Sequence, residues 1–358
     1  MVEDNDITLF FAILRDALWR EKRDQLPTEL SDSEATAILT LAAKQTVSGL
    51  VIDALFRHNI KMPRQNVLKS IGLLERIRKN SNDVNKGAIL LQQLFDESGV
   101  DYVIVKGQVV AAHYPEPLLR QSGDIDYYCN SKNFDNSQKA IQRHWGIYAE
   151  PEGSERHVHY TYKGCIYEGH FSLVSFHNKK RNAIWQQILD SDKGTTTIVD
   201  GARVRVLSPT LHAFYVFMHL YEHLLELGIG LRQFCDLAVL LHYCKNDISM
   251  DTLRMNLKAL GMEKAYRACG SILVDYLGLP ENELGYSIKA TDRRYGKKIL
   301  NVVFYRGNMG HYNKRNGFKG WKHKVEASGI KISHFMKFMP LAPKYTCCLM
   351  WNEFKRNL

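Results

Sequence analysis

The part of the chain that most constrains its fold is the segment from Val103 to Tyr128, VIVKGQVVAAHYPEPLLRQSGDIDYY. A short β-branched run ends at Gly107 and a helical pattern follows, which is typical of a strand that turns directly into a helix. A glycine at such a turn leaves backbone N–H groups accessible to a phosphate, and Lys106 would add positive charge. Asp124 and Asp126 lie two apart on a second strand pattern, so their carboxylates point to one face and can share divalent cations.

A third carboxylate is expected nearby, because two hard cations need more oxygen ligands than two aspartates supply. Glu168, in the strand pattern IYEGHFSLV, is the best candidate, and alternation places His170 on the same face. Glu150, Glu152 and Glu155, on the preceding loop, are alternatives. Three carboxylates beside a glycine-tipped phosphate site predict a two-metal centre for phosphoryl transfer.

The first hundred residues predict helices. Ser31 and Glu34 have the spacing of a capping box at the start of one helix. A long helix follows Pro63, because apolar residues recur with a period near 3.6, and Gly99 is its expected C-cap.

From Asp101 onward, strand and helix patterns alternate. The segment SKNFDNSQKAIQRHW predicts a helix with Ser131 as its N-cap, and HVHYTYKG and IYEGHFSLV predict two strands. Asp200-Gly201 predicts the turn of a hairpin, and helical patterns resume at Ser208-Pro209.

These patterns predict an α+β fold, with a mixed-sheet core flanked by an N-terminal helical domain and C-terminal helices. The predicted divisions are a helical domain (1–99), a catalytic core (100–207), a helical substrate or lid region (208–290) and a basic, aromatic-rich C-terminal segment (291–358).

The net charge of +10 is concentrated in that last segment. From Arg293 onward there are 15 Lys and Arg residues against 2 acidic ones, so the preceding chain is slightly acidic. Interleaved aromatic and basic residues could contact RNA or an anionic membrane surface, or could form a solvated face of the protein itself. No stable protein partner is predicted.

The compartment is predicted from charge, hydropathy and cysteine usage. The N-terminal residues are acidic, no run of 18 apolar residues occurs, and the 7 cysteines form neither a disulfide framework nor a CxxC motif. These features predict a cytoplasmic protein, with peripheral association with the inner membrane as an alternative.

The segments VIVKG, LLRQSGDIDYY and YEGH resemble an uncharacterised bacterial nucleotidyltransferase family of the polymerase-β-like nucleotidyltransferase superfamily. The resemblance covers about 101–176 well and extends more loosely over 219–241. The wider superfamily usually has Gly-Ser at the strand-to-helix turn, where this chain has Lys106-Gly107 and a longer gap before the first aspartate.

The resemblance implies a polymerase-β-like core, two Mg²⁺ ions and a nucleoside triphosphate substrate. It assigns Asp124 and Asp126 to the metal ions, and Glu168 to the third carboxylate, which would activate an acceptor hydroxyl. Arg120 could replace missing contacts to the β- or γ-phosphate through its bidentate guanidinium. The residues predicted to bind the nucleotide and cofactor are Lys106, Gly107, Arg120, Gly123 and His170.

The implied reaction moves a nucleoside monophosphate from the triphosphate to a hydroxyl of an unknown acceptor, such as a small molecule, sugar or protein. One alternative is a toxin-type nucleotidyltransferase acting on a tRNA end. Another is a non-catalytic nucleotide-binding module linked to surface-polysaccharide synthesis.

Two further polar groups have no assigned role. His212, His219 and His223 share one helical face by spacing, but the glutamate that an H-E-x-x-H zinc site needs after its first histidine is missing. Metal binding, contact with substrate and packing stay open for them. Arg232 and Asp236 have i, i+4 spacing for structural or acceptor-binding use.

Overall fold

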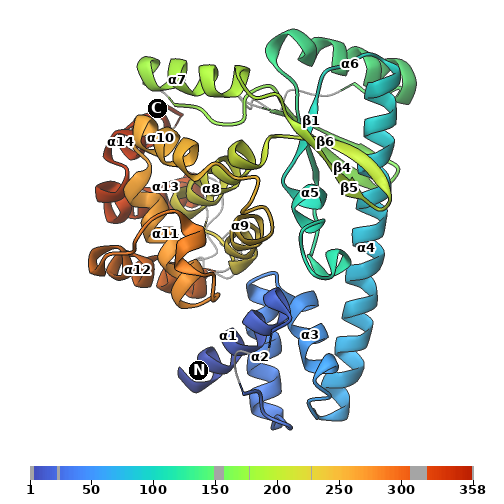
Figure 1. Ribbon diagram of the computed structural model, residues 1–358, viewed down its shortest axis with the longest axis vertical. Coiled ribbons are helices and arrows are strands. Elements are labelled where there is room, and N and C mark those ends of the chain that lie inside the picture. Colours follow the sequence, from blue (N-terminus) through green and yellow to red (C-terminus); the bar gives the residue numbers. More distant parts are fainter. Residues whose placement is uncertain are drawn as a thin grey trace. The chain divides into compact units, whose positions relative to one another are not determined.

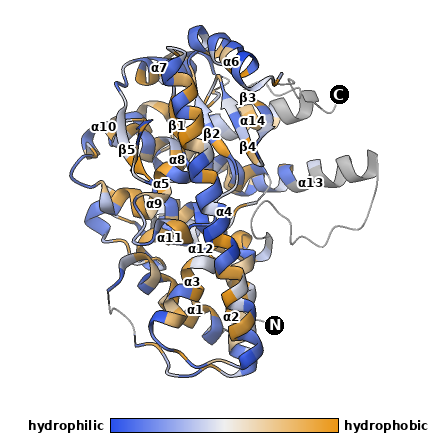
Figure 2. Cartoon of the chain, turned by 90° about the vertical axis from the view of Figure 1, so that its right-hand side faces the viewer, coloured by the Kyte–Doolittle hydropathy of each residue, from blue (hydrophilic) through white to orange (hydrophobic). Residues whose placement is uncertain are grey.

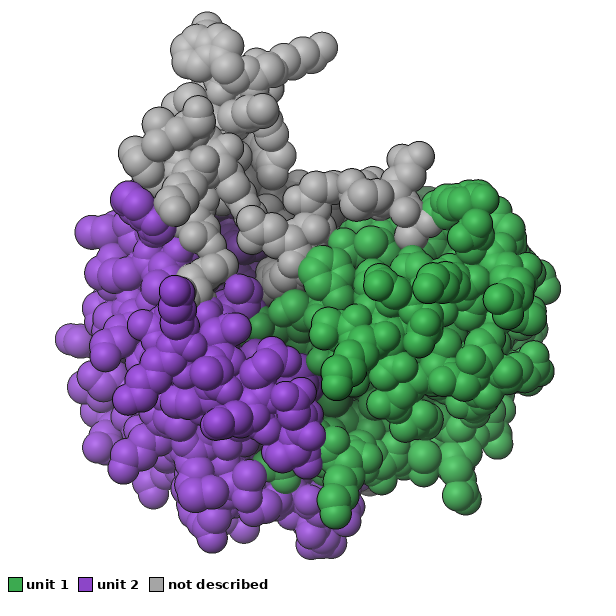
Figure 3. All heavy atoms as spheres, turned by 90° about the horizontal axis from the view of Figure 1, so that it is seen from above, with its two compact units in different colours: residues 1–42, 47–174, 192–212 green, residues 43–46, 175–191, 213–358 purple. Residues whose placement is uncertain are grey.

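The computed structural model contains two compact units (Figure 3). Figure 1 labels helices and strands along the chain. Unit 1 comprises residues 1–42, 47–174 and 192–212, and unit 2 comprises residues 43–46, 175–191 and 213–358. The residues that the structure describes are 4–21, 25–148, 157–176, 178–226, 228–306 and 321–356.

Four helices open the chain: α1 (Asp4–Trp19), α2 (Asp32–Lys44), α3 (Ser48–Arg57) and α4 (Arg64–Glu97). The predicted capping box of α2 is confirmed, because the Ser31 N–H donates to Oε2 of Glu34 at 2.8 Å and the Glu34 N–H donates to Oγ of Ser31 at 3.3 Å. The long helix after Pro63 is also confirmed. Gly99 follows its end with a φ of +64°, a conformation that favours glycine.

A four-stranded mixed sheet follows α4. Its strands are β1 (Val103–Val105), β2 (Ile125–Tyr128), β3 (His157–Tyr162) and β4 (Cys165–His170). The order is β1-β2-β4-β3, and β2 and β4 are parallel while the other two pairs are antiparallel. The sheet with its flanking helices confirms the predicted α+β fold class.

Helix α6 (Ser131–Trp145) follows β2 in the chain, and its predicted N-cap was wrong by one residue. Asn130 is the cap, because its Oδ1 accepts a hydrogen bond from the Asn133 N–H at 3.0 Å. Ser131 is already in the helix. Both residue types are good caps, and the end of the strand pattern did not distinguish the two positions.

Short elements complete unit 1. They are α5 (Gly107–Ala111), the 3-10 helix η1 (Pro117–Leu119) and a hairpin of β5 (Thr195–Val199) and β6 (Ala202–Val206). The predicted hairpin turn is confirmed, since Asp200 and Gly201 have φ values of +46° and +78°, as a type I′ turn requires.

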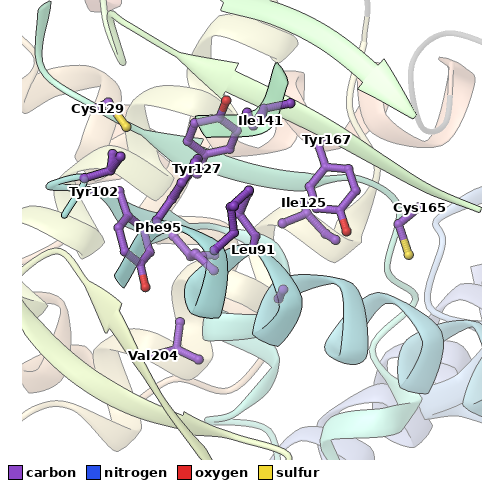
Figure 4. Close-up of a cluster of buried hydrophobic side chains, with 14 of the residues drawn as sticks. Leu91, Phe95, Tyr102, Ile125, Tyr127, Cys129, Ile141, Cys165, Tyr167 and Val204 are labelled. Carbon is purple, nitrogen blue, oxygen red and sulfur yellow. The ribbon is translucent and has the colours of Figure 1, made fainter. Parts of the chain in front are cut away.

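One core cluster of unit 1 lies between one face of the sheet and helix α4 (Figure 4). Phe95 of α4 contacts Tyr102 and Tyr127 edge-on, with ring centroids 5.1 Å apart in each pair. Gly87 lets α4 approach the sheet closely, because a Cβ there would lie 2.7 Å from Cδ1 of Ile125. The predicted boundary at residue 99 stays a prediction.

Unit 2 is helical in its described residues. Helix α8 (Pro209–Glu226) runs from the last residues of unit 1 into it. Its other elements are α7 (Lys179–Asp190), α9 (Leu231–Tyr243), α10 (Met250–Leu260), α11 (Glu263–Asp275), η2 (Glu281–Leu284), α12 (Ala290–Arg306), α13 (Trp321–Phe338), η4 (Met339–Leu341) and α14 (Pro343–Arg356).

Buried contacts hold the C-terminal helices onto α8. The Tyr345 hydroxyl donates to Glu222, and the Tyr221 hydroxyl donates to the Phe338 carbonyl at 3.4 Å. Helices throughout the chain mix hydrophilic and hydrophobic residues (Figure 2), and none in the described ranges has the length and hydropathy to cross a membrane.

Candidate active site

The predicted carboxylates meet on the face of the sheet opposite α4. Parallel pairing of β2 with β4 places Asp126 directly across from Glu168, and Asp124 immediately precedes β2. One carboxylate oxygen from each of the three residues lies within 4.8 Å of the others. We call Asp124, Asp126 and Glu168 the acidic triad. The structure brings its members together as the sequence predicts, and their catalytic role stays a prediction.

Asp126 is a buried carboxylate held by two cationic or hydrogen-bonding partners. Its Oδ1 lies 2.6 Å from Nζ of Lys106 and 2.9 Å from Nε2 of His170. Burial acts to raise the pKa of Asp126, but the Lys106 ammonium and His170 together bring the pKa well below its usual range. Asp126 is therefore ionised at neutral pH.

Lys106 reaches Asp126 from an unusual backbone conformation at the end of β1. Its φ is +58° and its ψ is −150°, in a region that residues with a Cβ seldom occupy and that requires about 1–3 kcal/mol of compensation. Gly107 follows with a φ of +43° as the first residue of α5. Lys106, which the sequence predicts to contact a phosphate, thus forms an ion pair with Asp126 of the acidic triad.

Glu168 differs from Asp126 in its charge environment. Burial, and then the negative charge of Asp126, raise the pKa of Glu168 to about 8, although Lys106 acts in the opposite direction. Nδ1 of His157 and Nε2 of His170 lie 3.2 Å and 3.6 Å from its Oε1. The triad therefore pairs a carboxylate that is firmly ionised with one that readily takes up a proton.

Sequence reasoning missed His157. It lies on β3 directly opposite His170, because the two-residue turn at Lys163-Gly164 sets the hairpin register. Counting outward from that turn in HVHYTYKGCIYEGH pairs the two histidines. The Lys-Gly turn was therefore the signal that could have identified it.

The remaining predicted site residues in unit 1 are not tested by these contacts. Arg120 is buried between η1 and β2, and its carbonyl accepts a hydrogen bond from the Ser81 hydroxyl at 3.2 Å. Gly123 is exposed, with open space where a Cβ would project. Nucleotide contacts by both stay predictions.

The other candidates lie elsewhere. Glu150, Glu152 and Glu155 fall outside the described residues, as do residues 307–320 of the predicted basic segment. The candidate histidines and ion-pair residues of the helical region are on α8 and α9: His212, His219, His223, Arg232 and Asp236. The rings of His219 and His223 are in contact, with centroids 4.3 Å apart.

Comparison with known proteins gives the family. A family model described as "uncharacterised nucleotidyltransferase" matches residues 31–278, which is more than half of the chain and includes the acidic triad. This match defines a protein of the nucleotidyltransferase class. The chain belongs to this uncharacterised nucleotidyltransferase family, and the predicted family is confirmed.

Two other comparisons add little. No curated protein matches the sequence. Among solved structures, the chain is similar to an antigenic nucleotidyltransferase-like protein from Paracoccidioides brasiliensis, at 16% identity and a TM-score of 0.36, over 56% of this chain and 94% of that one. The assignment rests on the family match.

Proposed function

We propose that this protein transfers a nucleoside monophosphate from a nucleoside triphosphate to an acceptor hydroxyl, in a reaction that depends on divalent metal ions. The observation that carries the proposal is the direct pairing of Asp126 with Glu168 across β2 and β4, with Asp124 completing the acidic triad. The family match supports nucleotidyl transfer in general.

The donor set of the acidic triad fits magnesium. Hard divalent cations prefer carboxylate oxygens, and the three carboxylates converge within 4.8 Å. Burial and then the charge of Asp126 raise the pKa of Glu168, and Lys106 opposes this only in part, so a bound cation would relieve the repulsion between the carboxylates. When bound, Mg²⁺ would stabilise negative charge on the oxygens of the α-phosphoryl group and of the leaving pyrophosphate.

The side chains of the chain itself then have distinct roles. Asp126 stays ionised because Lys106 and His170 hold its Oδ1, so it offers a permanent negative charge. Glu168, directly across from Asp126, would accept the proton of an attacking hydroxyl once a bound cation favours its ionised form. Lys106, at the turn from β1 into α5, would add positive charge beside a bound phosphate.

The test is transfer of label from each of four α-labelled nucleoside triphosphates, with Mg²⁺, to small-molecule, RNA and protein fractions of a cell lysate. We expect one fraction to be labelled by the wild-type chain and not by Asp124→Asn. The labelled fraction identifies the acceptor class. Equal labelling by Asp124→Asn, or no labelling with any nucleotide and fraction, would overturn the proposal.

A further inference from the structure

The face of the sheet that carries the acidic triad also carries a second group of metal-binding side chains. His157 lies directly opposite His170 in the pairing of β3 with β4, and Glu168 precedes His170 by two positions. Because side chains two apart on a strand share a face, all three project together. One potential ligand atom from each lies within 4.8 Å of the others. We call His157, Glu168 and His170 the histidine triad.

The geometry points to a metal site: we propose that the histidine triad binds one divalent transition-metal ion of the Mn²⁺ to Zn²⁺ series, in addition to the cations of the acidic triad. Glu168 belongs to both groups, so its carboxylate would bridge the two sites. The inference goes beyond nucleotidyl transfer and does not require it.

The distances between the donor atoms match those between neighbouring ligands of a single ion. Oε1 of Glu168 lies 3.2 Å from Nδ1 of His157 and 3.6 Å from Nε2 of His170. Ligands bonded tetrahedrally at roughly 2.0–2.1 Å lie about 3.3 Å from one another. Nε2 of His170 now contacts Oδ1 of Asp126 at 2.9 Å, so binding would exchange that contact for a bond to the ion and leave Lys106 as the partner of Asp126. No change in the strand register is needed.

The donor types determine which ion fits. Two imidazole nitrogens and one carboxylate form a set that first-row transition metals favour, whereas Mg²⁺ and Ca²⁺ prefer oxygen donors alone. The acidic triad offers only oxygens. The two neighbouring groups thus differ in the metal that each would select.

His157 is the triad residue best suited to substitution, because it lies at the edge of the sheet and is partly exposed. β3 is an edge strand of the four-stranded sheet, and a quarter of the His157 side chain is exposed. His159, also on β3, has its ring centroid 4.7 Å from that of His157 but is not part of the triad. Replacing His159 is therefore a matched control for replacing His157.

The experiment uses the full chain, stripped of metal with a chelator and then titrated with Co²⁺ in the absence of nucleotide. Visible d–d absorption reports Co²⁺ bound to imidazole. We expect saturation at one Co²⁺ per chain, displacement by Zn²⁺ and no displacement by excess Mg²⁺. His157→Gln should weaken Co²⁺ binding by at least about tenfold, while His159→Gln and Asp124→Asn should keep the spectrum.

The alternative is that the two histidines only hydrogen-bond the carboxylates. Wild-type affinity in His157→Gln, or displacement of Co²⁺ by Mg²⁺ as readily as by Zn²⁺, would establish that alternative and overturn the proposal. Circular dichroism checks folding, and His157→Asn provides a second variant if His157→Gln does not fold. Because the readout contains no nucleotide, its failure would leave the Mg²⁺-dependent transfer assay of Asp124→Asn unaffected.

Discussion

The two faces of the four-stranded sheet are made by the same strands and have opposite chemistry. On one face, Asp126 and Glu168 lie side by side among charged and imidazole groups. On the other face, Tyr127 and Tyr167 are fully buried in the apolar cluster against α4. Because side chains alternate along a strand, each charged residue is the chain neighbour of a buried tyrosine: Asp126 of Tyr127 on β2, and Glu168 of Tyr167 on β4.

The residues that stabilise the sheet and the residues predicted to do its chemistry therefore lie on different faces. Burial of apolar surface against α4 favours folding, whereas three converging carboxylates oppose it through desolvation and repulsion. Substitutions on the charged face should therefore change activity more than stability, and substitutions on the α4 face should do the reverse.

The largest expected effect is on the charged face. Asp124→Asn removes one carboxylate of the acidic triad while keeping its size, and we expect the rate of nucleotidyl transfer to fall by at least roughly 10³-fold. The melting temperature should stay the same or rise, because Asp124 is only partly buried and its charge raises the pKa of Glu168. A wild-type rate, or a large drop in melting temperature, would contradict the separation of the two faces.

The next effect is on the opposite face. Phe95→Ala removes a fully buried ring that contacts Tyr102 and Tyr127, and should lower the free energy of unfolding by about 3–4 kcal/mol. Urea denaturation measures this change. Leu68→Ala, on the same helix with 60% of Leu68 exposed, is the control and should have little effect.

Glu168 should make the stability of the chain depend on pH. The pKa of Glu168 is raised to about 8 in the folded chain and is about 4.3 when unfolded, so the folded chain holds its proton more tightly. The resulting stabilisation is complete below the unfolded pKa and is lost as pH rises through the folded pKa. With chelator present, the free energy of unfolding should fall by up to about 1.4 kcal/mol per pH unit between about pH 5 and 8.

Glu168→Gln is the control for that dependence, because it cannot ionise. A slope between pH 5 and 8 that persists unchanged in Glu168→Gln would show that other groups cause it. Divalent metal should also reduce the slope in the wild-type chain, since a bound cation favours the ionised carboxylate.

The alternation that creates the two faces could be predicted from the sequence. The contacts between residues of different strands could be predicted only in part. DIDYY and IYEGH each carry polar residues two apart, so local pattern alone predicted which side chains of each strand share a face, with Glu168 as the best of several candidates for the third carboxylate. The contact of Lys106 with Asp126 could not, because it depends on a positive φ that no residue pattern indicated. His157 required the register of the β3–β4 hairpin, which the Lys163-Gly164 turn sets.

The role of α4 illustrates the same limit. Its apolar period predicted a helix with one buried face, but a period does not say which surface covers that face. In the structure, α4 residues Leu91 and Phe95 lie in the core cluster with Tyr127 and Tyr167 of the sheet (Figure 4). The surface that a helix packs against is formed by residues distant in sequence. For α4, this surface is the sheet, whose residues all follow Gly99 in the chain.

The smallest effects compare two glycines of α4 and should have opposite signs. Gly87→Ala places a Cβ 2.7 Å from Cδ1 of Ile125 and 2.9 Å from Sγ of Cys165, so we expect overpacking to lower the free energy of unfolding by about 1–3 kcal/mol. Gly72→Ala meets nothing within 4 Å and should raise it by about 0.5–1 kcal/mol, because alanine favours the helix. Denaturation of both variants in urea measures the difference. If both alanines stabilise the chain equally, α4 does not pack closely against the sheet at Gly87. The stability of the sheet would then not come from the packing of its apolar face against α4 at this point.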